Sequence, residues 1–143
     1  MTLFISEKSK KKSLAIFISY VGIAIFIAVF GIVYEQFSHN VFSAEMYFAW
    51  VWVLGFGLIP HAVLCFAPIK KVPGIISGSI YNLGVAFVTT RSIYIGVIDI
   101  YGTNNTKWVV TYTIVGIIFL VAGAMFYLTA LLLSLVDNEE KKI

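Results

Sequence analysis

Arg91 is the residue in this sequence whose placement most clearly needs a chemical explanation. It lies inside a long apolar run, about ten residues before Tyr101. A guanidinium at such a depth in a membrane costs a few kcal/mol, so it needs an ionic partner or a wet cavity. Glu35 and Glu45 stand at the ends of two neighbouring runs, and we expect one of them to form a structural ion pair with Arg91. The alternative is a contact between the guanidinium and an anionic ligand.

A polar cavity inside the helices is the second chemical possibility. Pro60 cannot donate a backbone hydrogen bond, so we expect a kink just before His61, where freed carbonyls could face a cavity. Asn82 and Arg91 are nine positions apart, which at about 100° per residue places them on opposite faces of one helix. The candidate lining residues of a binding cavity are Arg91, Asn82, Thr89, Thr90 and His61.

Metal-ligating side chains gather near the outer ends of the apolar runs, at Glu35, His39, Glu45 and Asp99. Glu35 and His39 have the i, i+4 spacing of one helix face, and such side chains bind zinc or manganese. No HExxH pattern accompanies them, so we expect no metal site. His61 has no second axial histidine at its own depth for a haem. We therefore expect no cofactor.

No residue constellation indicates catalysis. A membrane-embedded enzyme would need an acid or a nucleophile beside His61 or Arg91, and the sequence places none there. Cys65 has no second cysteine with which to form a disulfide within the chain. The sequence therefore favours a protein that is not an enzyme.

The composition indicates a membrane protein. Of the 143 residues, 60% are hydrophobic and only 12% are charged, and the mean hydropathy is +0.96. A soluble domain of this size cannot bury so much apolar surface. The net charge of +3 does not indicate a nucleic-acid partner, because the basic residues flank apolar runs instead of forming a polar face.

Four apolar runs organise the chain into a single transmembrane domain. They cover about residues 13–34, 44–66, 74–101 and 108–136, and each is long enough to cross a hydrocarbon core of roughly 30 Å. Short loops make consecutive helices antiparallel neighbours. The predicted fold is all-α, an integral membrane four-helix bundle of up-down-up-down topology.

The basic residues predict the orientation of this bundle. Eight of the ten Lys and Arg fall on one side of the implied threading, in the clusters Lys8 to Lys12, Lys70–Lys71 and Lys141–Lys142. Basic flanks face the cytoplasm, so both termini are predicted to be cytoplasmic. We expect a multi-pass protein of a bacterial plasma membrane, with the lipid bilayer as its first partner.

The third run carries a ridge of small or polar residues at a spacing of four: Gly74, Gly78, Asn82, Ala86 and Thr90. Small residues at this spacing let a second membrane helix approach closely, so Gly74, Gly78 and Ala86 are candidate helix-packing positions. The leading hypothesis is a non-enzymatic subunit or accessory protein that associates with itself or with a larger membrane complex. The alternative is a small-solute or ion transporter with a polar cavity around Arg91.

Overall fold

The computed structural model describes residues 2–38, 41–66, 75–103 and 106–140, and these residues form helices without any strand. The elements are α1 (Thr2–Gln36), α2 (Ala44–Tyr47), α3 (Ala49–Trp52), the π-helix η1 (Val53–Leu58), α4 (Ile59–Phe66), α5 (Ile75–Tyr101) and α6 (Thr106–Glu140). The prediction of an all-helical chain is confirmed.

Three helices are long and apolar enough to cross a membrane. Their apolar spans are Leu14–Gln36 in α1, Ile75–Tyr101 in α5 and Lys107–Thr129 in α6. The second run, predicted at 44–66 with a kink before His61, is divided into four short elements, of which the apolar part is Ala49–Val63. The described chain therefore has three long apolar helices and one broken helical stretch.

The break in the second stretch follows from its glycines and its proline. Pro60 has no N–H for the carbonyl of Phe56, and η1 widens the helix over the turn just before it. Gly57 lies in this wide turn, where a Cβ atom would overlap the ring of Tyr20 in α1. The sequence predicts a kink at this place, and the structure forms it as a π-helix that admits an aromatic ring.

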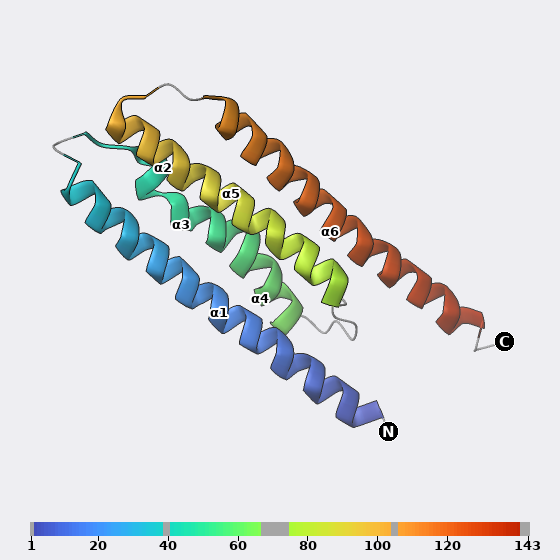
Figure 1. Ribbon diagram of the computed structural model, residues 1–143. Coiled ribbons are helices and arrows are strands. Elements are labelled where there is room, and N and C mark those ends of the chain that lie inside the picture. Colours follow the sequence, from blue (N-terminus) through green and yellow to red (C-terminus); the bar gives the residue numbers. More distant parts are fainter. Residues whose placement is uncertain (1, 39–40, 67–74, 104–105, 141–143) are drawn as a thin grey trace.

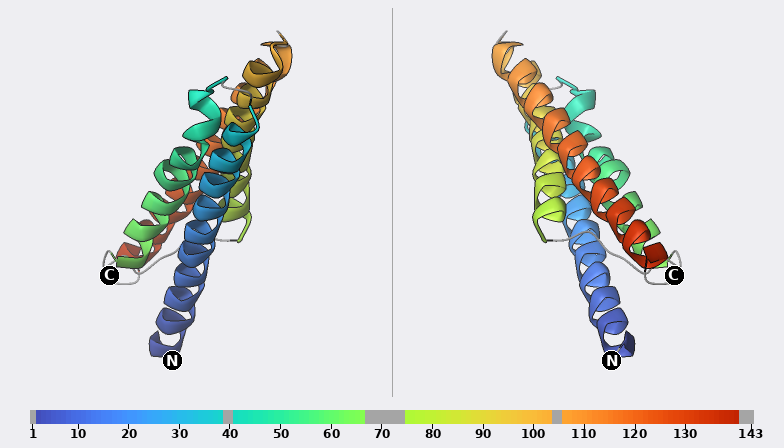
Figure 2. Two further views of the ribbon diagram at one scale, coloured as in Figure 1. Left: turned by 90° about the vertical axis from the view of Figure 1, so that its left-hand side faces the viewer. Right: turned by 90° about the vertical axis from the view of Figure 1, so that its right-hand side faces the viewer.

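The helices pack in an order that places α5 between α6 and the broken stretch. α6 packs against α5, while α2, α3 and η1 lie between α5 and α1 (Figure 1). The start of α1 and the end of α6 lie at the same end of the molecule in all views (Figure 2). α1 and α5 run in the same direction, from that end toward the end that holds Glu35, which we call the Glu35 end.

Small residues set the close contact between α5 and α6. A Cβ atom on Gly84 would lie 2.6 Å from the backbone nitrogen of Leu120, and one on Gly123 would lie 2.6 Å from that of Tyr81. Ser77 also donates a hydrogen bond of 3.2 Å to the carbonyl of Gly123. The backbones thus approach through Ser77 and Gly84, seven residues apart, and not through the predicted ridge at a spacing of four.

The buried core lies on the other side of α5, between α1 and the broken stretch. It consists of side chains that are at most 8% exposed: Tyr20, Ala24, Ile27, Ala49, Val53 and Val85. These residues come from α1, α3, η1 and α5, so the broken stretch is held in place by packing on two long helices.

Candidate functional site

Arg91 lies in a cluster of polar side chains with Glu45, Ser92 and Thr113, which we call the Arg91 cluster. Its Nη1 donates to both carboxylate oxygens of Glu45 at 3.2 Å, and its Nε donates to Thr113 Oγ1 at 3.1 Å. Ser92 Oγ donates to Glu45 Oε2 at 2.8 Å. The cluster joins α2, α5 and α6 by hydrogen bonds in which one or both groups are charged.

The ion pair in this cluster is only partly accessible, since the Arg91 side chain is 22% exposed and that of Glu45 is 36% exposed. Of the two acids named as partners in the sequence, Glu45 is the one that contacts Arg91. The guanidinium therefore points at an acid of its own chain, which balances its charge.

Glu35 has a different role in the structure. Its Oε1 accepts a hydrogen bond of 2.9 Å from the backbone N–H of Ser43, and Ser43 Oγ donates to Asp99 Oδ2 at 2.7 Å. Ser43 is the N-cap residue of α2 and is only 1% exposed. One serine thus connects an acid of α1 with an acid of α5 at the start of α2.

Met46 fills the space between α1 and α5 beside these polar groups. A Cβ atom on Gly31 would lie 2.9 Å from the carbonyl oxygen of Met46, and one on Gly96 would overlap the Met46 side chain. Met46 itself is 1% exposed. Glycines on two helices therefore make room for Met46, Gly31 for its backbone and Gly96 for its side chain, which fixes the position of α2.

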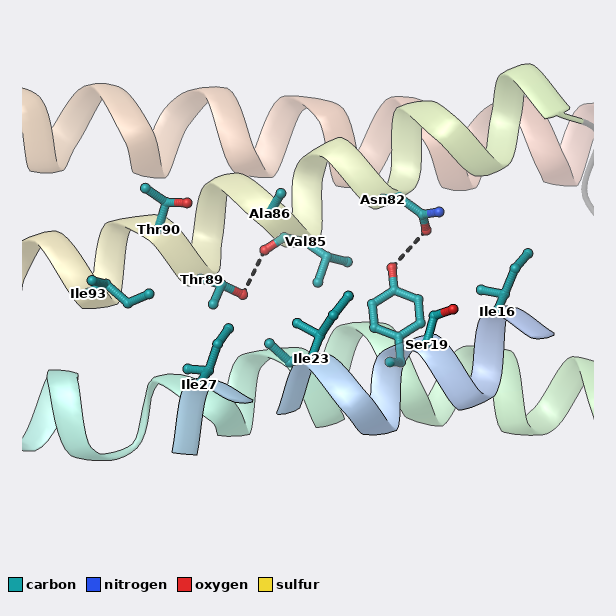
Figure 3. Close-up of a pocket in the computed structure, with 12 residues that line it drawn as sticks. Ile16, Ser19, Ile23, Ile27, Asn82, Val85, Ala86, Thr89, Thr90 and Ile93 are labelled. Carbon is teal, nitrogen blue, oxygen red and sulfur yellow. Dashed lines mark hydrogen bonds between the residues drawn. The ribbon is translucent and has the colours of Figure 1, made fainter. Parts of the chain in front are cut away.

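A groove of about 460 Å³ runs between α1 and α5 on the side away from the Arg91 cluster, and Asn82, Thr89 and Thr90 line it (Figure 3). Asn82 Oδ1 accepts a hydrogen bond of 2.7 Å from the Tyr20 hydroxyl, and Thr89 Oγ1 donates to the carbonyl of Val85 at 2.9 Å. Neither Arg91 nor His61 is among the lining residues. The structure thus separates the five candidate cavity residues into three places.

His61 is buried behind the ring of Tyr20. Its Nδ1 lies 2.9 Å from the carbonyl oxygen of Gly57, and its ring centroid lies 5.0 Å from that of Tyr20. A carbonyl oxygen can only accept, so Nδ1 carries a proton in this contact. The imidazole bonds a carbonyl in the π-helical turn, which makes it part of the local backbone structure.

The candidate metal ligands do not form a site among the residues that the structure describes. No group of three or more His, Cys, Asp and Glu side chains lies together in that part of the chain. Glu35 and Asp99 both bond Ser43, while Glu45 bonds Arg91. His39 and the side chain of Cys65 lie outside the described part.

Three residues of the predicted ridge on α5 line the groove: Asn82, Ala86 and Thr90. Nothing lies within 4 Å of a Cβ atom placed on Gly78, and Ala86 and Thr90 are exposed groove residues. Gly74 lies outside the described residues. Close packing of Gly78 and Ala86 against a helix stays a prediction.

Three polar residues of these clusters were not identified from the sequence: Ser43, Ser92 and Thr113. Ser43 could have been identified as a helix-start residue, because serine directly before a helical run is a preferred N-cap. Ser92 and Thr113 are common residues in membrane helices, and no spacing distinguishes them. Comparisons of the chain with protein-family models, curated proteins and solved structures found no match.

Proposed function

We propose that this chain is an integral membrane protein that crosses the bilayer four times in an up-down-up-down arrangement, with the broken stretch Ala44–Phe66 as its second crossing. The three long apolar helices support this proposal. Large apolar side chains also remain exposed along their outward faces, among them Phe26 at 69%, Ile118 at 58% and Leu132 at 61%. Apolar surface of this extent is stable in hydrocarbon and aggregates in water.

The lysine clusters support an orientation with both termini in the cytoplasm of a bacterium, since basic flanks are retained on that side of the plasma membrane. Single cysteines introduced at Lys71 and at Thr103 test it in a variant in which Cys65 is replaced by serine. A membrane-impermeant maleimide should label position 103 in intact cells and label position 71 only after the cells are opened. Labelling of position 71 from outside would overturn the orientation.

We further infer that the protein acts as a non-enzymatic subunit or accessory protein of a membrane complex. The supporting observation is that the polar side chains between its helices bond to one another. Arg91 is held by Glu45 and Thr113, so its guanidinium does not face the groove. Transport through a cavity around Arg91 is the alternative, and it would need this ion pair to open.

Purification in a mild detergent followed by native mass spectrometry tests the subunit role. We expect a second protein chain to remain bound. As a control, unlabelled cells that carry the tagged chain are mixed before extraction with isotope-labelled cells that lack it. A partner bound in the cell is then recovered unlabelled, whereas a protein that binds after extraction is recovered in both isotopic forms. A monomer or homodimer without any other chain would refute the subunit role. An absorption spectrum of the same sample tests the expectation that no chromophore is bound.

A further inference from the structure

The π-helical turn η1 pairs its backbone groups one position farther apart than an α-helix does. The N–H of Ile59 donates to the carbonyl of Leu54, five positions back, whereas an α-helix would pair Ile59 with Gly55. Such turns are rare, and they occur as single insertions in α-helices. Pro60 does not select this form, because its missing N–H leaves one carbonyl unpaired in either case. That carbonyl belongs to Phe56 in an α-helix and to Gly55 in a π-helix.

The ring of Tyr20 supplies the cause of the π form. It lies against Gly57, where a Cβ atom would overlap the ring carbons, and its hydroxyl donates to Asn82 Oδ1 at 2.7 Å (Figure 3). An α-helical turn uses one residue fewer, so each later residue would take the place of the residue that now follows it. Phe56 would then take the place of Gly57 and collide with the ring. The seated ring thus permits the π form and excludes the α form.

Phe56 gives the α form a packing contact of its own once the Tyr20 ring is withdrawn. In the π form, the Phe56 side chain is 39% exposed and stacks on Trp52 with a centroid distance of 5.7 Å. Withdrawal of the Tyr20 ring would leave an empty space beside the helix, and an empty space in a packed core is destabilising. In the α form, the aromatic ring of Phe56 would occupy this space. The same space can therefore be filled by Tyr20 or by Phe56.

The α4 end of the broken stretch is the end that can turn. At the other end, α2 is held by the bonds of Ser43 to Glu35 and Asp99 and by Met46, which packs against glycines of α1 and α5. α4 follows η1 and packs mainly against α1. Loss of the extra residue in η1 would rotate α4 by about 100° around its axis. At a radius of about 5.5 Å, this rotation moves a side chain by about 8 Å.

The rotation would change the surroundings of His61. In the π form its ring is buried, its Nδ1 lies 2.9 Å from the carbonyl oxygen of Gly57, and its ring centroid is 5.0 Å from that of Tyr20. In the α form, His61 would take the half-buried place that Ala62 holds now. The backbone N–H of His61 would pair with the Gly57 carbonyl, as in any α-helix, and would replace the side-chain contact. The imidazole surroundings therefore differ between the two forms.

We propose that η1 is a two-state turn through which α1 sets the rotation of α4. With the Tyr20 ring seated against Gly57 the turn is π-helical. When α1 withdraws the ring, Phe56 enters its place, the turn becomes α-helical and α4 rotates. The two forms exchange one packed aromatic ring for another, and conformational switches use bistable packing of this kind. A displacement of α1 is thereby converted into a change at His61, whether or not the chain has a partner protein.

Nitroxide labels on α4 measure this rotation. Single cysteines at positions 59 and 62, in a chain with Cys65→Ser, are labelled in mild detergent, and their collision with oxygen is measured by electron paramagnetic resonance. Ile59 is exposed and Ala62 is half-buried in the π form. In the Tyr20→Ala variant, accessibility at position 62 should rise to the value that position 63 has with Tyr20 present, and accessibility at position 59 should fall. General loosening of the helices would raise both.

Gly57→Ala tests the same contact from its other side. Its Cβ atom displaces the Tyr20 ring, so we expect the same pair of opposite changes at positions 59 and 62. Two matched controls should leave both positions unchanged: Tyr20→Phe, which keeps the ring, and Gly55→Ala, whose Cβ atom has open space. A label at the exposed Ile118 of α6 should be unchanged in every variant, because α6 takes no part in the rotation.

The opposite signs at the two labelled positions decide the outcome. Unchanged labels at positions 59 and 62 in a folded Tyr20→Ala variant would overturn the two-state turn, and so would a rise at both positions. An equal response in Tyr20→Phe would assign the cause to the hydroxyl and not to the ring, which also overturns the proposal. Gly57→Ala decides the question where Tyr20→Ala does not fold.

Discussion

Removal of either member of the ion pair between Arg91 and Glu45 should destabilise the folded protein. The losses of unfolding free energy in the two single variants should not be additive in the double variant. The pair has two hydrogen bonds at 3.2 Å and is 22% and 36% exposed at its two side chains. Exposed pairs contribute up to about 1 kcal/mol and loss of one partner of a buried pair costs about 3–5 kcal/mol. This partly exposed pair lies between the two limits, so we expect Arg91→Gln and Glu45→Gln each to cost about 2 kcal/mol.

The coupling between the two substitutions follows from what each leaves behind. Arg91→Gln leaves Glu45 with the hydroxyl of Ser92, and Glu45→Gln leaves Arg91 charged beside Thr113. The double variant leaves no unpaired charge, so its loss should be smaller than the sum by about 1.5 kcal/mol, near the upper end for interhelical hydrogen bonds in membranes.

Reversible unfolding by sodium dodecyl sulfate in mixed micelles, followed by far-ultraviolet circular dichroism, measures these free energies. Lys107→Gln is the control, because it removes an exposed charge at the Glu35 end and should change stability by less than about 0.5 kcal/mol. Losses that add to within about 0.3 kcal/mol would refute a structural pair.

Three further substitutions, two of them with a matched control, test helix packing and one hydrogen bond in the same unfolding assay. Gly84→Ala should cost about 1–3 kcal/mol, because its Cβ would meet the backbone of Leu120, whereas Gly78→Ala has open space and should be neutral or stabilising. Gly57→Ala should likewise destabilise by about 1–3 kcal/mol through overlap with a buried tyrosine ring, while a similar loss in Gly55→Ala would show that the ring is not the cause. Ser43→Ala should cost about 1 kcal/mol by removing the bond to Asp99, and an unchanged midpoint would exclude that contribution.

The sequence predicts the positions of the helices better than their internal form. The apolar runs locate α1, α5 and α6 because burial or lipid contact requires apolar side chains along their whole length. The apolar pattern does not predict that α1 begins as early as Thr2, because lysine and serine residues interrupt the pattern without breaking the helix. Gly55, Gly57 and Pro60 predict a break, but whether it becomes a kink or a π-helix depends on the Tyr20 ring from another helix.

The site was less predictable than the fold because the contacts of its residues depend on which side chains of other helices lie within reach. The charge of Arg91 demands an acid, and two were available at the correct end; only the positions of α1 and α2 decide that Glu45 reaches it. The ridge on α5 shows the complementary problem. Small residues at a spacing of four indicate a surface that can be approached closely, but the spacing does not say by what.

The groove has a structural cause in the contacts at its two ends. At the Glu35 end, Met46 is wedged between Gly31 of α1 and Gly96 of α5, which holds the two helices at a set separation. At the other end, the hydrogen bond between Tyr20 and Asn82 spans the same two helices. Because both ends are held by packed or bonded side chains, α1 and α5 cannot close over the space between them without breaking one of these contacts.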